Sequence, residues 1–162
     1  MPTEAVLLKQ VAMPELLDIH VPESACTLMA IAKIRKEFEG QGKWVGMNIL
    51  GDAAARMMKM VIVVDEDIDI RNWTEVIWAL NTRVQPHRDI EIIKDVTGCA
   101  LDPSTELKER TIFTARTSKL LIDATKYDAH AFEIPCSPHP EAAMFVNTNW
   151  DSYGIDLSPW GG

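Results

Sequence analysis

The feature that most constrains the fold of this chain is a short apolar run, Met60 to Val64, set between Lys59 and Asp65. The run is far too short to cross a bilayer. Its four consecutive aliphatic residues, Val61 to Val64, instead predict a strand that is covered on both faces, as in a parallel sheet. A sheet of this kind needs helices packed against it, so the run favours an α/β fold.

Two strands and one helix are predicted before this run. Residues 17–21 alternate between apolar and polar side chains, so the apolar residues, beginning with Leu17, are expected to face the core from a half-buried strand. Residues 27–34 are apolar at nearly every position and predict a second, more buried strand. A turn with two glycines then opens a helix over about residues 43–57. Its apolar residues cover most of the circumference and predict that it is well buried.

A capped helix and two more strands are predicted after the run. Asn72 can cap a helix, and Glu75, three residues later, completes a pair that resembles a capping box. Pro86 ends this helix, and residues 89–96 form a strand. Strand, helix and strand with short joins make a right-handed crossover by default. Residues 120–124 return to strand.

Together these elements predict an α/β domain over residues 17–126, with a mixed, mainly parallel sheet of about five strands and helices packed on it. Residues 1–16 are expected to be a lead-in segment without a core of its own. Residues 102–118 are polar and predict a surface loop or a partly ordered flap. Residues 127–162 combine prolines with scattered aromatic residues. They are expected to form an irregular tail that packs on another surface, such as a partner subunit.

Charge and cysteine content exclude several classes of protein. The formal net charge of −8 argues against a nucleic-acid surface, because phosphate binding needs clustered Lys and Arg. The three cysteines stand far apart without a C-x-x-C pair, which favours reduced thiols over a disulfide framework. The N-terminus lacks a basic segment followed by an apolar one, so no signal peptide is predicted. The expected location is the cytoplasm.

An acidic run, Asp65 to Asp69, directly follows the apolar run and allows two interpretations. Oxygen ligands at the C-terminal end of a strand suit Mg²⁺ or Mn²⁺, and Asp65, Asp67 and Asp69 would then make the chain a stand-alone metal-binding enzyme. Alternatively, the run is a solvated turn that supplies carboxylates to the start of the next helix. The solvated turn is favoured, because the spacing matches no ligand template.

Four other features carry a weaker chemical signal. Gly40-Gln41-Gly42 lacks the spacing of phosphate-binding loops and favours a tight turn with positive φ. The four histidines are isolated in sequence, so no zinc site is predicted. Cys99 has no indicated base partner, and a buried apolar role is favoured over a nucleophilic one. Lys119 could meet an anion and Asp123 could orient a cation, but surface ion pairing is the favoured interpretation for both.

Several segments follow one another in an order that is typical of one enzyme family. The most specific are VDEDIDI at residues 64–70, WALNTR at residues 78–83 and IDATK at residues 122–126, and LDPS at residues 101–104 agrees with them. In this order they resemble the C-terminal domain of the UbiD-type decarboxylases and carboxylases. The resemblance covers residues 3–126, and the tail has no counterpart in it.

The resemblance implies a particular chemistry and a division of labour. Members of the family use prenylated FMN with Mn²⁺ and K⁺, and they remove or add CO₂ on aromatic or α,β-unsaturated acids. Their flavin and metal ligands and their catalytic Glu-Arg-Glu set lie in a preceding domain that this chain lacks. The chain is therefore expected to be one component of a carboxy-lyase, inactive alone, with a larger flavin-binding subunit that holds the cofactor.

The resemblance also implies where this chain approaches a substrate. Two family segments do so, and they correspond here to Ala55 and Arg56 and to Cys99 and Leu101. Arg56 departs from the family pattern and could bind a substrate carboxylate or phosphate as a planar, two-pronged donor. Asp52 stands near the position where some members carry a lysine that meets the cofactor. No catalytic or metal-binding residue is expected in this chain.

Two readings of the chain remain open at this point. It is either the small, wall-completing subunit of a homo- or hetero-oligomeric (de)carboxylase, or a non-catalytic oligomerisation module derived from the same domain. The initial Met1 favours a naturally split enzyme, although a truncated domain would have the same sequence. Replacement of Arg56 is expected to distinguish the two readings.

Overall fold

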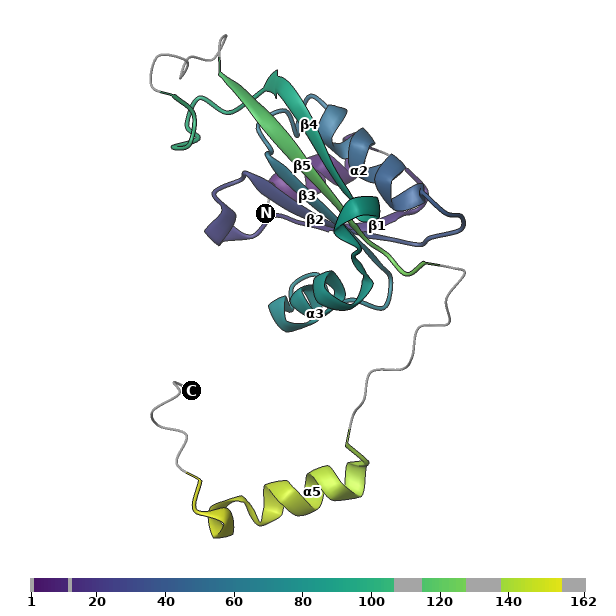
Figure 1. The fold of residues 1–162 in the computed structure, drawn as a ribbon, viewed down its shortest axis with the longest axis vertical. Helices are drawn as coiled ribbons and strands as arrows, with labels where there is room; N and C mark the ends of the chain where they lie inside the picture. Colours follow the sequence, from purple (N-terminus) through teal and green to yellow (C-terminus); the bar gives the residue numbers. More distant parts are fainter. Residues whose placement is uncertain (1, 12, 107–114, 128–137, 156–162) are drawn as a thin grey trace. The chain divides into compact units, whose positions relative to one another are not determined.

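The computed structural model describes residues 2–11, 13–106, 115–127 and 138–155 (Figure 1). The chain begins with a helix and then alternates between strands and helices. In order, the elements are α1 (Pro2–Val11), β1 (Leu16–His20), η1 (Glu23–Ala25), β2 (Met29–Ile34), α2 (Gln41–Gly51), β3 (Met60–Asp65), α3 (Trp73–Arg83), α4 (Pro86–Asp89), β4 (Ile90–Thr97), β5 (Arg116–Ala124), α5 (Pro140–Thr148) and η3 (Trp150–Tyr153).

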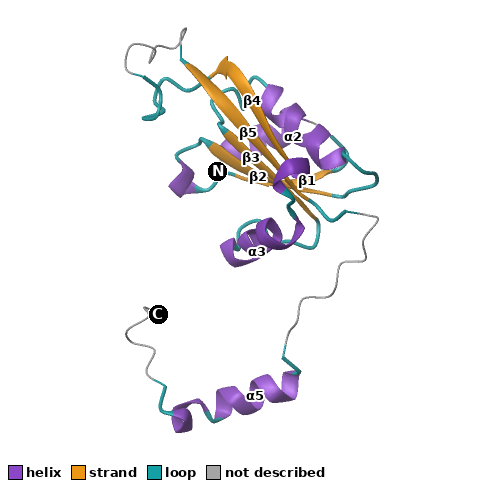
Figure 2. Ribbon diagram, viewed as in Figure 1, coloured by secondary structure: helices purple, strands orange, loops and turns teal. Residues whose placement is uncertain are grey.

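The five strands form one mixed sheet in the order β1-β2-β3-β5-β4 (Figure 2). β2, β3 and β5 are parallel, whereas β1 and β4 are antiparallel edge strands, so two of the four pairings are parallel. The predicted α/β class and the strand number are confirmed. The predicted crossover from β3 through α3 to β4 is wrong, because β4 is antiparallel to β5 and therefore runs opposite to β3, whereas a crossover joins parallel strands. The side chains of β4 are mostly exposed, which suits an edge and not an inner parallel strand.

β3 is covered on both faces, as its apolar run predicts. Val61 and Val63 belong to a core cluster that includes Leu7 of α1 and Ile49 of α2. The alternate residues of β3 belong to a second cluster with α3, made of residues such as Ile62, Val64, Val76 and Ala79. α1 and α2 therefore cover one face of the sheet and α3 covers the other.

The first residues do more than lead into the domain. They form α1, and Leu7 on this helix is fully buried in the core of the sheet. The Glu4 carboxylate accepts hydrogen bonds from the Val21 backbone at 2.8 Å and contacts His20 Nδ1 at 2.9 Å. These contacts join α1 to the end of β1, so the segment shares the core of residues 17–126.

The pattern of β1 differs from the prediction at one residue. Leu17 is 38% exposed, whereas Leu16, Ile19 and Val21 are buried. The pairing with β2 changes register between Leu16 and Asp18, as in a β-bulge. A bulge moves the side chains before it to the other face of the strand, and a strict alternation cannot reveal it.

α2 is shorter and less buried than its sequence predicts. It ends at Gly51 and not near residue 57, because Asp52 has extended backbone angles. The Asp52 Oδ1 atom accepts a hydrogen bond from the Ala54 backbone at 2.7 Å, and this local bond competes with another helical turn. Trp44 and Met47 are 44% and 50% exposed, since only one face of α2 packs on the sheet.

The start of α3 agrees with the predicted cap. The Asn72 side chain accepts a hydrogen bond from the Thr74 backbone at 3.0 Å, and its Nδ2 atom donates to Glu75 Oε1 at 3.0 Å. Both groups lie within four residues of each other, so the cap is a local property of the sequence. The helix ends at Arg83, before Pro86.

The tail forms a compact unit of its own, Ala131–Gly162, apart from the unit Met1–His130. It was expected to be irregular, but it contains α5 and η3. α5 has no buried residue, and Met144 and Phe145 are 69% and 65% exposed. Trp150 packs edge to face on Tyr153 with ring centroids 6.3 Å apart. In the part of the chain that the structure describes, no helix is long and apolar enough to span a membrane.

Candidate functional site

The segment between α2 and β3 turns twice and sorts its side chains between core and surface. Ala55 donates its backbone N–H to the Asp52 carbonyl at 3.1 Å, and Met58 donates to the Ala55 carbonyl at 2.8 Å. Ala55 is consequently fully buried in the core beside α2, and Arg56 and Met57 are exposed. The segment lies at the end of the sheet where the parallel strands β2, β3 and β5 begin.

A second loop follows β4, and a buried aspartate holds it at the same end of the sheet. The Asp102 carboxylate accepts hydrogen bonds from Lys59 Nζ at 2.9 Å and from the Ser104 backbone at 2.9 Å. Burial alone would raise the pKa of Asp102, but Lys59 and Ser104 hold that pKa below its ordinary value. Asp102 also donates its backbone N–H to the Cys99 carbonyl. Because Lys59 directly precedes β3, this contact positions the turn that carries Cys99.

The two segments enclose a pocket of ≈ 260 Å³, called the apolar pocket below. It is lined by Arg56, Met57, Thr97 and the turn 98–101. Three of the four residues predicted to approach a substrate, Arg56, Cys99 and Leu101, therefore meet at one place. Ala55, the fourth, lies in the core and lines none of the pockets described here.

The residues that line the apolar pocket are suited to binding a ligand and not to acid–base chemistry. Cys99 is buried, and its Sγ atom lies 3.8 Å from Met57 Sδ. Leu101 is 87% exposed, so an apolar side chain remains uncovered at this surface. The described lining residues include no histidine and no carboxylate that could act as a base for the thiol. The pocket can bind and shape an apolar ligand, with Arg56 as its charged group.

A second pocket, of ≈ 410 Å³ and called the cationic pocket below, adjoins the apolar pocket and shares Arg56 and Thr97 with it. Its lining includes Asp52 and Lys119. Lys119 is only 5% exposed, and its Nζ atom donates to the Leu50 carbonyl at 3.1 Å. Burial lowers the pKa of Lys119. The predicted surface ion pair of Lys119 is therefore wrong, because β5 carries this side chain inward beneath the end of α2.

Among the lining residues that sequence reasoning missed are Met57 and Thr97 of the apolar pocket. Met57 was assigned to the end of α2, where it would have been an ordinary helical residue. Thr97 is the last residue of β4, and no motif marks it. Their roles depend on the turn at Asp52 and on the edge position of β4.

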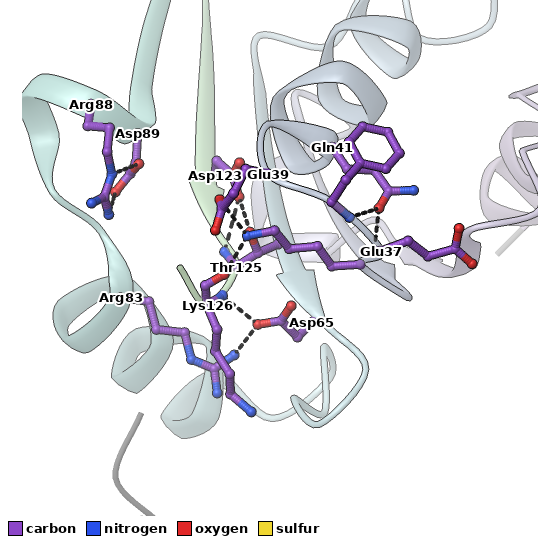
Figure 3. Close-up of polar contacts among 12 residues, drawn as sticks. Glu37, Glu39, Gln41, Asp65, Arg83, Arg88, Asp89, Asp123, Thr125 and Lys126 are labelled. Atoms are coloured by element: carbon purple, nitrogen blue, oxygen red, sulfur yellow. Dashed lines mark hydrogen bonds and ion pairs between the residues drawn. The ribbon is translucent and has the colours of Figure 1, made fainter. Parts of the chain in front are cut away.

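At the opposite end of the sheet, where the parallel strands end, the acidic run forms an ion-pair cluster around Arg83 (Figure 3). Arg83 is 2% exposed; its Nη1 atom lies 2.8 Å from Asp65 Oδ2, and its Nη2 atom lies 2.9 Å from Asp67 Oδ2. The Lys126 backbone donates to Asp65 at 2.7 Å, and its ammonium lies 2.6 Å from Asp67. Figure 3 shows Asp65, Arg83 and Lys126 converging from the ends of β3, α3 and β5.

The cluster is self-neutralised and does not fit a divalent cation. Burial raises the pKa of Asp65, whereas Arg83 and Lys126 outweigh burial and lower the pKa of Asp67. A metal ion would have to displace both cations from these carboxylates. Among the described residues, no group of three His, Cys, Asp or Glu side chains could hold a metal ion. The favoured solvated turn holds for the exposed members Glu66, Asp67 and Asp69, although Asp67 is also paired with Arg83 and Lys126. It does not hold for Asp65, which is half-buried.

The glycines before α2 serve packing and a turn. Gly40 has φ of 80°, which confirms the predicted tight turn. A Cβ atom on Gly42 would lie 2.2 Å from Asp123 Oδ1. That same Oδ1 atom accepts hydrogen bonds from the Thr125 backbone at 3.1 Å and the Thr125 hydroxyl at 2.7 Å, so Asp123 stabilises a local turn. A carboxylate beside the turn also disfavours a bound phosphate.

The chain is similar to known proteins along most of its length. The family model for the 3-octaprenyl-4-hydroxybenzoate carboxy-lyase (UbiD) C-terminal domain matches residues 1–124. An uncharacterized protein from Aeropyrum pernix is 32% identical over 153 residues, which cover 91% of this chain and 30% of that protein.

Two solved structures are similar in fold and sequence. The UbiD-class enzyme HmfF from Pelotomaculum thermopropionicum, in complex with FMN, has a TM-score of 0.72 and 32% identity, covering 90% of this chain and 32% of that one. The vanillic acid decarboxylase of Sedimentibacter hydroxybenzoicus in its open form has a TM-score of 0.70 and 27% identity, covering 94% of this chain and 33% of that one. The chain thus spans about a third of the length of these relatives.

Proposed function

Because this chain belongs to the family of UbiD C-terminal domains, we propose that it is the small subunit, or the separated C-terminal domain, of a UbiD-like (de)carboxylase. The substrate is an aromatic or α,β-unsaturated acid. The observation that carries the proposal is the apolar pocket, which joins Arg56 to the turn of Cys99 and Leu101 on a surface with an uncovered leucine. Such a surface suits the wall of a site that another chain completes.

The partner chain, in this proposal, holds prenylated FMN, Mn²⁺ and K⁺. Two observations support that division. The described carboxylates at Asp65 and Asp67 are already paired with cations. Asp52 stands near the position where some members of the family carry a cofactor-binding lysine, and a carboxylate cannot donate the hydrogen bonds that a lysine would. The bound flavin supplies the electron-accepting chemistry of decarboxylation, which side chains alone do not provide.

Each of the four wall residues has a distinct part in this proposal. Arg56 donates hydrogen bonds to an oxyanion of the ligand, because in the described part of the chain no acceptor is paired with it. Cys99 and Leu101 contact the apolar body of the ligand and exclude water from it. Ala55 anchors Arg56, because its burial fixes the turn from which the arginine projects.

The tail is proposed to pack on a partner subunit in a homo- or hetero-oligomer in the cytoplasm. The unit that contains it leaves Met144, Phe145 and Tyr153 exposed. These side chains need an apolar surface to cover them, and a subunit interface would supply one.

The test is co-expression of this chain with candidate flavin-binding large subunits. We expect a complex that retains coloured flavin and releases CO₂ from an aromatic acid, whereas neither chain alone does so. Arg56→Ala is expected to leave the complex intact and to lower turnover at least about tenfold, as the loss of a charge-assisted donor would. The matched control is Arg35→Ala, which replaces an exposed arginine at the opposite end of the sheet.

The same variants test the alternative, a non-catalytic assembly module. Unchanged turnover of the Arg56→Ala complex would support it. If no large subunit forms a complex with this chain, the split-enzyme proposal fails.

A further inference from the structure

We propose that the cationic pocket is a subsite for a second oxyanion of the ligand, which makes the ligand of this surface an aromatic or unsaturated acid with two anionic groups. The identity of the ligand as an acid rests on the proposed function. The existence of the subsite rests on the contacts of Arg56, Lys119 and Asp52 alone.

The first argument is that two cations line this pocket without a carboxylate partner among the described residues. Arg56 has no acceptor there, and the described partner of Lys119 is the neutral carbonyl of Leu50. A nearly buried ammonium without a counter-charge is costly to the fold. A bound anion would supply the missing charge.

The second argument concerns the free donors. An ammonium group has three N–H donors, and the Leu50 carbonyl accepts from one of them. The Arg56 guanidinium offers a planar pair of donors that matches an oxyanion. Asp52 opposes an anion, but its Oδ1 atom accepts the Ala54 N–H at 2.7 Å, and the three ionisable side chains together leave one positive charge. A single carboxylate group balances that charge.

The third argument is the position of the cationic pocket beside the apolar pocket. Both are lined by Arg56 and Thr97, so the arginine stands between a polar and an apolar compartment. The apolar pocket, at ≈ 260 Å³, has room for a single ring or a short unsaturated chain. A ligand with its apolar body there would present a substituent to Arg56 and Lys119.

A third depression also contacts Arg56, but it lacks the second cation. It measures ≈ 390 Å³ and is lined by Thr27, Ala53, Ala54, Arg56, Met57 and Met58. No other charged group among these residues could bind an oxyanion. The pair of Arg56 and Lys119 therefore distinguishes the cationic pocket as the subsite.

The experiment is an NMR titration of the intact chain with benzene-1,3-dicarboxylate, with benzamide and with inorganic phosphate. We expect the dicarboxylate to bind about tenfold more tightly than the uncharged benzamide, as one charge-assisted contact provides. The resonances of Arg56, Thr97 and Lys119 should shift together. In Arg56→Gln the dicarboxylate should bind no better than benzamide, whereas the control Arg35→Gln should bind like the natural chain.

Lys119→Gln tests the second cation, with thermal unfolding as the check that it folds, and Lys119→Arg should restore part of the affinity. If Lys119→Gln does not fold, Arg56→Gln alone decides. Equal affinities for the dicarboxylate and benzamide, or a dicarboxylate affinity that survives Arg56→Gln, would overturn the proposal. Binding of phosphate at these residues without a preference for the dicarboxylate would also overturn it, and would identify a phosphate site instead. Because no flavin subunit is present, these outcomes do not depend on the complex tested above.

Discussion

Arg83 illustrates how much of this molecule depends on single buried charges. Its guanidinium binds Asp65 and Asp67, and it lies 5.1 Å from the centre of the Trp78 ring. The cluster joins α3 to the ends of β3 and β5, so it connects elements at one end of the sheet. Its value to the fold lies in the pairing, because each partner would be a poorly solvated charge without the others.

Replacement of Arg83 should therefore be expensive. We expect Arg83→Met to lower the free energy of unfolding by about 3 kcal/mol, because it leaves the Asp65 carboxylate buried without its guanidinium. Urea denaturation measures the loss. The control Arg35→Gln removes an exposed ion pair with Glu66 and should cost no more than about 0.5 kcal/mol. A loss below about 1 kcal/mol in Arg83→Met would show that the cluster is not stabilising.

Lys119 predicts a specific pH dependence of stability. Burial lowers its pKa in the folded chain below the ordinary value of 10.5, so the unfolded chain binds the proton more tightly. The folded state is penalised at neutral pH, and stability from this group rises as the pH increases toward the unfolded value. In Lys119→Met this contribution should vanish. The amount by which the free energy of unfolding of Lys119→Met exceeds that of the natural chain should therefore shrink as the pH is raised.

Urea unfolding of both proteins at neutral and at alkaline pH measures this difference. Lys94→Met, at an exposed lysine of β4, is the control and should change little with pH relative to the natural chain. A constant difference between Lys119→Met and the natural chain across the range would contradict the buried, protonated state assigned to Lys119.

At the scale of elements, the contact of α2 with β5 depends on missing side chains. A Cβ atom on Gly46 would lie 2.1 Å from Leu121 Cδ1, and Leu121 is fully buried. The helix therefore lies closer to the strand than any larger residue at this position would allow. This close approach also carries the end of α2 over Lys119 and forms one side of the cationic pocket.

Gly46→Ala should destabilise the chain by about 2 kcal/mol, because the overpacked helix must move away from β5. The matched variant is Gly51→Ala at the end of the same helix, where an added Cβ atom meets nothing within 4 Å. It should be neutral or should stabilise the chain by up to about 1 kcal/mol, through the better helix propensity of alanine. Both values come from chemical denaturation, and equal effects of the two variants would refute the packing argument.

At the scale of the whole molecule, the chain consists of a unit that contains the sheet and a unit that contains the tail. In our proposal the tail packs on a partner subunit. If that is correct, a chain truncated after His130 should unfold with a free energy within about 0.5 kcal/mol of the full chain. It should also lose its association with the large subunit or with further copies. Urea unfolding and light scattering measure the two effects. A large loss of stability would mean that the tail packs on its own sheet.

Local signals predicted the elements whose causes are local. The apolar run at 60–64 predicted the doubly covered β3, since burial on both faces leaves its mark on every residue of a strand. Asn72 and Glu75 predicted the start of α3, because their hydrogen bonds reach only a few residues. Gly40 predicted its turn through its own backbone freedom. The family resemblance, likewise carried by short stretches, is borne out by the match over residues 1–124.

Packing between distant parts decided the rest. β4 pairs with β5 as an antiparallel edge strand, so the expected parallel crossover from β3 does not form. The bulge exposed Leu17, and the turn at Asp52 ended α2 early. Met57 and Cys99 meet across 42 positions of sequence, and Arg83 reaches Asp65 across 18. Such contacts are chosen by the free energy of the complete core, which no window of the sequence contains, and so the pocket belongs to the tertiary structure.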